Sequence, residues 1–211
     1  MIFKNSEAGF IVNNIIKTIQ SNKEYLSEID GKIGDGDHGI NMNKGFTMCQ
    51  SKLENKDFSL SEGFKTLSEV LMDDIGGSMG PLYGVFFEEF SLSITEDERD
   101  AETFAVILNN SIGAIQSIGN AKIGDKTLLD TLIPAYEGFE NALAEGKNFY
   151  DALEELKKCA FQGWKSTEDM IAKIGRASRL GERSRGVLDA GATSCYLILN
   201  STADSIQEIL K

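Results

Sequence analysis

The chain has 211 residues, of which 41% are hydrophobic and 26% charged, a composition that suits one folded domain over residues 1–211 and excludes global disorder. With 33 acidic against 21 basic residues, the formal net charge is −12, so the surface repels phosphate backbones and anionic membranes, and we expect neither nucleic acid nor a membrane as partner. Three widely spaced cysteines and an N-terminal segment that turns polar too early for a signal peptide predict a cytoplasmic protein without disulfides.

Apolar side chains recur at helical spacing along the whole chain. Ile11, Ile15 and Ile19, for example, repeat every four residues and would line one face of a helix. The pattern predicts eight helices, over residues 11–26, 41–53, 64–75, 81–92, 101–118, 127–145, 149–172 and 191–209. We find no segment that alternates apolar and polar residues as a half-buried strand does. The chain is therefore predicted to be all-α, a multi-helix bundle.

Capping residues and a charged turn mark the helix boundaries. Ser6 is interpreted as the N-cap of the first helix, and Ser59, followed three residues later by Glu62, matches a capping box. Residues 96–100 are mostly acidic and are expected to form a turn on the solvated surface. No internal repeat or domain boundary divides the chain.

Three carboxylates cluster between the first two predicted helices. Asp30, Asp35 and Asp37 lie within eight residues of one another, and like charges this close repel unless a cation holds them. Carboxylate oxygens without cysteine suit Mg²⁺ or Ca²⁺. A calcium-binding EF-hand loop starting at Asp35 fails, because Phe46 stands where that loop requires Glu. The cluster therefore predicts a Mg²⁺ site, and a plain Asp/Gly turn is the alternative.

The residues after these carboxylates indicate a phosphate contact. His38 is the only histidine of the chain and lies inside the acidic loop. Gly36 and Gly39 let the backbone approach a ligand, and the helix that begins near Gly39 exposes N–H groups that can bind an anion. A second helix N-terminus lies within residues 76–84, where glycines flank Ser78. That second loop is either an anion site or a tight turn with a good cap.

Two further glycine-rich loops carry cationic side chains. Residues 119–127 end in Gly-Asp-Lys-Thr, whereas a P-loop has Lys directly after Gly and follows a strand, so we interpret the segment as part of a nucleotide pocket without a P-loop. Four of the five arginines fall within residues 176–185. Because Arg binds phosphate with a planar fork, this clustering indicates phosphate binding, and a cationic loop neutralised by the acidic surface is the alternative. Together the four loops predict a polyphosphate site with metal ions.

These loops in combination resemble the L subunit of dihydroxyacetone kinase, the nucleotide-binding part of that enzyme. The resemblance extends over nearly the whole chain, and the segments that carry it most specifically are residues 33–42, 76–84, 124–130, 175–184 and 189–194. The resemblance implies an eight-helix antiparallel barrel with ADP or ATP held by the loops at one end. It also implies that Asp30, Asp35 and Asp37 hold two Mg²⁺ ions that bridge the nucleotide phosphates.

The resemblance further implies which residues bind the nucleotide. They are His38, Gly39, Ile40, Asn41, Ser78, Met79, Gly119, Thr127, Leu128, Arg176, Asp189, Ala190 and Gly191. Arg176 is also expected to act in catalysis. Two positions depart from the family pattern: Met79 replaces a Ser, and Ala190 replaces a Pro that would restrict the backbone. A backbone contact at Met79 would survive this change, and a hydroxyl contact would be lost.

By the same resemblance, the chain transfers a phosphoryl group to dihydroxyacetone on a K-type partner subunit, which binds the ketose through a histidine. His38 is already assigned to the metal loop, so that histidine must come from the partner. An M-type phosphotransferase subunit would rephosphorylate the bound ADP. An ATP-dependent subunit of a ketose or ketotetrose kinase is the alternative enzyme. A nucleotide-sensing regulator and a lipid-binding helical barrel are hypotheses from other classes, and a homodimer stays open.

Overall fold

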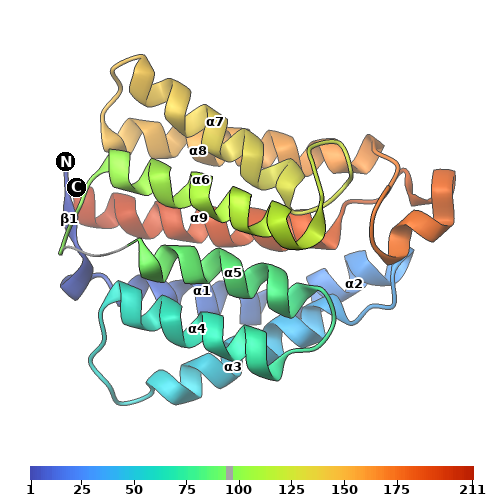
Figure 1. Ribbon diagram of the computed structural model, residues 1–211, viewed down its shortest axis with the longest axis horizontal. Helices are drawn as coiled ribbons and strands as arrows, with labels where there is room; N and C mark the ends of the chain where they lie inside the picture. The colour runs from blue at the N-terminus through green and yellow to red at the C-terminus, as the bar shows by residue number, and fades with distance from the viewer. Residues whose placement is uncertain (94–96) are drawn as a thin grey trace.

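A computed structural model describes residues 1–93 and 97–211. Within those residues it contains nine α-helices and two strands of two residues each. The helices are α1 (Phe10–Ser21), α2 (Lys23–Ile33), α3 (His38–Leu53), α4 (Leu60–Asp74), α5 (Met79–Leu92), α6 (Ala101–Gly119), α7 (Leu129–Ala144), α8 (Phe149–Ser166) and α9 (Ala190–Leu210). The predicted all-α class is confirmed, and Figure 1 shows the helices running along one common axis.

The predicted number of helices was wrong by one. The segment expected as a single helix over residues 11–26 is divided into α1 and α2 at Asn22. Asn22 leaves the helical region with φ −106° and ψ 11°, and its side-chain amide donates to the carbonyl of Thr18 at 2.8 Å. Asn favours such local bonds at helix ends, and an apolar periodicity that continues across the break conceals it.

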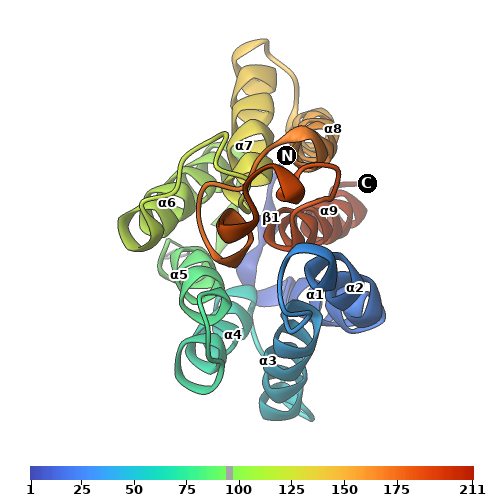
Figure 2. The same cartoon turned by 90° about the vertical axis from the view of Figure 1, so that its right-hand side faces the viewer.

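Eight of these helices nevertheless form the expected closed ring. Each of α1, α3, α4, α5, α6, α7, α8 and α9 packs against the next, and α9 packs against α1 to close the ring. Helix α2 is the additional element and packs against α3 and α9 (Figure 2). Consecutive ring helices are antiparallel, so the connections before α3, α5, α7 and α9 all lie at one end of the barrel (Figure 1).

Three smaller expectations need correction. Ser6 does not cap α1; it lies in the 3₁₀ helix η1 (Asn5–Glu7), and its N–H donates to Asp97 Oδ1 at 2.8 Å. The strands β1 (Phe3–Lys4) and β2 (Glu98–Arg99) pair antiparallel and are too short to show alternation. Of the predicted surface turn over residues 96–100, position 96 lies outside the described residues, and Arg99 is buried rather than solvated.

Helix α8 also ends earlier than predicted. It stops at Ser166 and is followed by the 3₁₀ helix η2 (Thr167–Asp169), after which Met170 is extended. The hydroxyl of Thr167 donates to the carbonyl of Trp164 and accepts the N–H of Asp189. Thr167 therefore connects the end of α8 to the start of α9 and turns the chain out of the ring.

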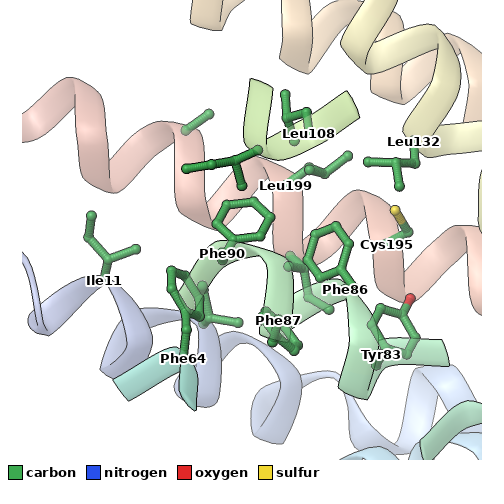
Figure 3. Packing of buried hydrophobic residues seen from close by; sticks show 14 of the residues in the cluster. Ile11, Phe64, Tyr83, Phe86, Phe87, Phe90, Leu108, Leu132, Cys195 and Leu199 are labelled. Atoms are coloured by element: carbon green, nitrogen blue, oxygen red, sulfur yellow. The ribbon is translucent and has the colours of Figure 1, made fainter. Parts of the chain in front are cut away.

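Aromatic and aliphatic side chains fill the barrel interior (Figure 3). Phe86 and Phe87 are fully buried and meet edge to face with ring centroids 4.9 Å apart, and Phe64 stacks on Phe87 at 5.5 Å. A cavity lined in part by Phe90 and Phe104 has a volume of about 10 Å³, room for roughly one water molecule. An acyl chain does not fit in this cavity.

The capping box at α4 is confirmed, and it yields a prediction about stability. Ser59 Oγ accepts the N–H of Glu62 at 3.3 Å, and the Glu62 carboxylate accepts the N–H of Ser59 at 2.7 Å. Replacing Ser59 by Ala should lower the free energy of unfolding by about 1 kcal/mol, because a helix N–H loses its partner. Urea denaturation measures this. Ser51→Ala, which removes an exposed hydroxyl in α3, is the control and should change the free energy by less than about 0.5 kcal/mol.

Across residues 1–93 and 97–211, none of the helices combines the length and the apolar character that a bilayer crossing requires.

Candidate functional site

The carboxylate cluster lies in the turn between α2 and α3. Asp30 stands in the last turn of α2, Asp35 in the turn and Asp37 directly before α3, and each offers an oxygen within 4.8 Å of the others. Gly34 is required here, because a Cβ at that position would lie 2.4 Å from Asp30 Oδ1. Gly36, with φ +78°, provides the left-handed conformation that folds the turn back.

The donor set of this cluster fits a hard divalent cation. All three groups are carboxylates, two of them on exposed residues, and they converge without a thiol or an imidazole. Three negative charges at this separation repel one another, and a cation of charge two would relieve the repulsion. Asp30, Asp35 and Asp37 are thus placed as the sequence predicted, and the residues suit Mg²⁺ or a similar ion.

His38 connects this cluster to helix α9, on the other side of α1. Its backbone N–H donates to Asp30 Oδ2 at 3.3 Å, and its ring Nε2 lies 2.9 Å from Ser194 Oγ near the start of α9. Burial lowers the pKa of His38 to about 4, although the charge of Asp30 acts in the opposite direction. The imidazole is therefore neutral near pH 7, and either ring nitrogen can carry its proton.

Tyr83 and Ser194 complete a hydrogen-bond network that the sequence reasoning did not single out. The Tyr83 hydroxyl lies 2.6 Å from Ser194 Oγ and donates to the carbonyl of Gly191 at 3.0 Å. Burial raises the pKa of Tyr83, so the phenol stays protonated. The network joins α3, α5 and α9. Both residues lie inside the matching segments, and their hydroxyls were the only signal that could have identified them.

Gly39 has a packing role that differs from the expected one. A Cβ at Gly39 would lie 2.1 Å from the carbonyl of Lys23 and 2.6 Å from Ser27 Oγ, so glycine allows α3 to start directly against α2. Ile40 and Asn41 follow in the first turn of α3, and the Ile40 side chain is exposed. Backbone N–H groups of this turn therefore face the same end of the barrel as the carboxylates (Figure 1).

The second predicted phosphate loop precedes α5. Ser78 is exposed, and its side chain makes no capping hydrogen bond. Met79, by contrast, is 8% exposed and belongs to the hydrophobic core. Met79, which stands where the family pattern has Ser, therefore places an apolar side chain in the core. Only the backbone groups of this residue remain available to a ligand. Gly76 and Gly77 have open space around them, as a backbone anion site requires.

The loops before α7 and α9 lie against each other. Gly191 has room for no bulky side chain, since a Cβ there would lie 3.1 Å from Asp189 Oδ2 and 3.5 Å from the Leu128 N atom. Asp189 caps α9 by accepting the N–H of Ala192 at 2.7 Å. This cap orients the helix start although Ala190 stands in place of Pro. Thr127 and Gly119 lie at the two ends of the α6–α7 connection, and no described contact joins Gly119 to the carboxylate cluster.

The arginine-rich segment belongs to a longer structure that we call the cover loop, residues 170–187. It contains the 3₁₀ helix η3 (Arg176–Ser184) and crosses in front of the helix ring when the molecule is viewed along the barrel (Figure 2). Arg176 forms an ion pair with Asp35. Arg185 instead donates to the carbonyl of Asp169 at 2.6 Å and pairs with Glu182. Only Arg176, among the four arginines, is paired with the carboxylate cluster in the described structure.

Asp189 gives the site a defined pH dependence of stability. Burial raises the pKa of Asp189 from 3.8 to about 6, and the hydrogen bond from Ala192 and the charge of Lys126 oppose the shift. Because the folded state holds the proton more tightly than the unfolded state, this carboxyl favours folding most below pH 3.8. That contribution is lost as the pH rises through about 6.

Asp189→Asn tests this assignment, since its amide oxygen can still accept the Ala192 N–H. The difference in free energy of unfolding, wild type minus variant, should decrease when the pH is raised from 4.5 to 7.5. The decrease should be at most about 3 kcal/mol. Urea denaturation at both pH values measures the difference. Parallel pH profiles for the two proteins would contradict the assignment.

Comparison with known proteins identifies a family whose members resemble this chain. The DAK2 domain family matches residues 32–204. The chain is 40% identical over 181 residues to the "PTS-dependent dihydroxyacetone kinase, ADP-binding subunit DhaL" of Lactococcus lactis. This match covers 85% of the present chain and 86% of the L. lactis protein. The chain is also 35% identical over 191 residues to the "PEP-dependent dihydroxyacetone kinase 1, ADP-binding subunit DhaL" of Listeria innocua, covering 90% and 91%.

A solved structure shares the fold. The dihydroxyacetone kinase of C. freundii superposes with a TM-score of 0.67 at 25% sequence identity and covers 96% of this chain. The match covers 35% of that protein, so the chain spans about a third of its length.

Proposed function

The chain belongs to the DAK2 domain family, and on this premise we propose that it is the ADP-binding subunit of a dihydroxyacetone kinase. It acts in a phosphotransferase: the phosphoryl group passes from the bound nucleotide to dihydroxyacetone on a K-type partner subunit. The observation that supports this most directly is the convergence of Asp30, Asp35 and Asp37 beside Arg176 at one end of the barrel. Relatives named as ADP-binding subunits match this chain over nearly their whole length.

In this proposal the carboxylates hold two Mg²⁺ ions, which would neutralise charge on the nucleotide phosphates. The backbone N–H groups at the starts of α3, α5 and α9 bind phosphate oxygens, since helix N-termini favour anions. The neutral His38 imidazole offers an N–H to a phosphate oxygen and is oriented by Ser194. Arg176 supplies a cation on the side of the site that the cover loop faces.

The partner arrangement follows from what this chain lacks. Its single histidine, His38, lies in the carboxylate loop, so a histidine that holds the ketose must come from the K-type subunit. In this proposal an M-type phosphotransferase subunit rephosphorylates ADP that stays bound. The L. lactis and L. innocua relatives are named as ADP-binding subunits of a PTS-dependent and a PEP-dependent dihydroxyacetone kinase. The alternative is an ATP-dependent ketose or ketotetrose kinase, since an "L-erythrulose kinase" of Pectobacterium atrosepticum is 32% identical over 190 residues.

Acid denaturation of the purified chain, followed by chromatography of the released nucleotide, tests the proposal. About one ADP per chain would favour the phosphotransferase donor. A chain without nucleotide would favour exchange with ATP, and Mg²⁺ with ATP must then bind. Phosphorylation of dihydroxyacetone after addition of a K-type subunit would exclude a purely regulatory role. If neither ADP nor ATP binds in the presence of Mg²⁺, the proposed function is wrong.

A further inference from the structure

One buried lysine joins both ends of the cover loop to the loop before α7, next to the backbone hydrogen bond from the Lys173 N–H to the Asp125 carbonyl at 3.1 Å. Lys126 is 2% exposed, and its ammonium group donates to three carbonyls: Met170 at 3.1 Å, Ser184 at 2.5 Å and Val187 at 2.6 Å. An ammonium group has three hydrogens, so these bonds use its full donor capacity. Met170 precedes η3, Ser184 is its last residue and Val187 follows it, so Lys126 holds the two ends of the cover loop together.

The residues around Lys126 are arranged to present this side chain. Asp130 accepts the N–H groups of Gly124 at 2.5 Å and Thr127 at 2.8 Å, which fixes the loop before α7. Asp125 accepts the N–H of Lys122 at 3.0 Å. Lys126 itself adopts φ +63°, a conformation that costs free energy for a residue with a side chain. Asp130 thus binds backbone groups, and Asp125 binds a backbone group and also pairs with Lys173 of the cover loop at 3.7 Å. In the described structure, the Lys126 ammonium group hydrogen-bonds only to the cover loop.

Other contacts make the cover loop a single unit, so that restraining its ends restrains its middle. Ser184 Oγ accepts the N–H of Ala172 at 2.9 Å and donates to the carbonyl of Gly181 at 2.6 Å. Ser178 Oγ donates to the carbonyl of Gly175 at 2.7 Å, one residue before Arg176. Arg176 starts η3 and pairs with Asp35.

We propose that Lys126 is a positioning residue that holds the cover loop across the barrel mouth, and thereby keeps Arg176 at the carboxylate cluster and slows nucleotide release. The effect on nucleotide release rests on the proposed function. Lys126 reaches no ligand itself, because its donors are occupied by the loop carbonyls. The cover loop lies outside the ring of helices, so its release should leave the barrel core intact (Figure 2).

Lys126→Met is the direct test, because Met has a similar length and no donor. An arginine-specific protease provides a selective readout: four of the five arginines lie in the cover loop, and the fifth, Arg99, is 4% exposed. We expect cleavage after residues 176–185 to become about tenfold faster in the variant without any nucleotide, because local release exposes the chain. Lys122→Met removes an exposed lysine of the same loop and is the matched control, with cleavage as in the wild type.

The nucleotide consequence is measured separately, as the dissociation rate of a fluorescent ADP analogue in the presence of Mg²⁺. We expect at least a tenfold faster rate in Lys126→Met and no change in Lys122→Met. Lys126→Gln, which keeps two amide N–H donors on a shorter side chain, should lie between wild type and Lys126→Met in both measurements. The far-ultraviolet circular dichroism and the Tm of the barrel should stay close to those of the wild type.

The remaining outcomes of these measurements would contradict the proposal in whole or in part. Equal cleavage of wild type and Lys126→Met would overturn it. Faster cleavage with an unchanged dissociation rate would overturn the link to nucleotide release. Loss of helical signal in Lys126→Met would place the lysine in barrel folding and would also overturn the positioning role. If the wild type binds no ADP, the proposed function fails, and the cleavage rates still decide whether Lys126 holds the loop.

Discussion

Asp37→Asn should abolish most Mg²⁺-dependent nucleotide binding while leaving the fold unchanged. The Asp37 carboxylate is exposed and makes no hydrogen bond or ion pair within the described residues, so the amide replaces it without breaking a native contact. Removing a residue that only hydrogen-bonds to a metal ligand typically weakens metal binding about 10–100-fold. Asp37 would be a metal ligand itself, so its replacement should weaken the binding of Mg²⁺ and ADP by at least this factor. Isothermal titration of Mg²⁺ and ADP into wild type and variant measures the effect.

The matched control is Asp57→Asn, an exposed aspartate in the turn before α4. It changes the net charge equally, so any general electrostatic effect on an anionic ligand appears in both variants. The stability of the unliganded protein should be unchanged or slightly raised in Asp37→Asn, because two neighbouring carboxylates lose a like charge. If Asp37→Asn bound Mg²⁺ and ADP as tightly as Asp57→Asn, the carboxylate cluster would not be the metal site.

The parts of the fold and site that depend on local sequence could be predicted. The ring helices follow from apolar residues at 3.6-residue spacing, and the capping box at Ser59 follows from residues three positions apart. The proximity of Asp30, Asp35 and Asp37 was predictable for the same reason, because eight residues of chain cannot separate them far. The break at Asn22 was missed because the apolar pattern continues through it.

The parts that depend on distant contacts could not be predicted from the sequence. His38 meets Ser194 across 156 positions, and no local pattern encodes that pairing. The segment that contains Lys126 was interpreted as part of a nucleotide pocket because it is rich in glycine, carries lysine and ends in a hydroxyl residue. The partners of Lys126 are three carbonyls 44 to 61 positions away, and they decide its role. A burial pattern identifies a core position such as Met79 only when the helix boundary is known, and α5 starts two residues before the predicted helix.

The catalytic role that we propose for Arg176 leads to the second large effect. Arg176→Ala should lower the kcat of dihydroxyacetone phosphorylation, reconstituted with a K-type subunit, by about 10³-fold. An arginine that neutralises charge developing on a transferred phosphoryl group contributes on the order of 10³–10⁵ in kcat. The affinity for ADP should change by less than about tenfold, because the carboxylates and helix N-termini that bind its phosphates remain.

Arg179→Ala separates this effect from a general loss of positive charge. Arg179 lies in the same 3₁₀ helix, is exposed and has no partner among residues 1–93 and 97–211, so its removal should leave kcat within about twofold. Arg176→Lys keeps the charge and loses the planar fork, and it should recover only a small part of the lost rate. If Arg176→Ala and Arg179→Ala were equally active, the pairing of Arg176 with Asp35 would serve only to seat the cover loop. A fall in ADP affinity as large as the fall in kcat would instead assign Arg176 to binding, because catalysis requires interactions that are stronger in the transition state than in the bound ground state.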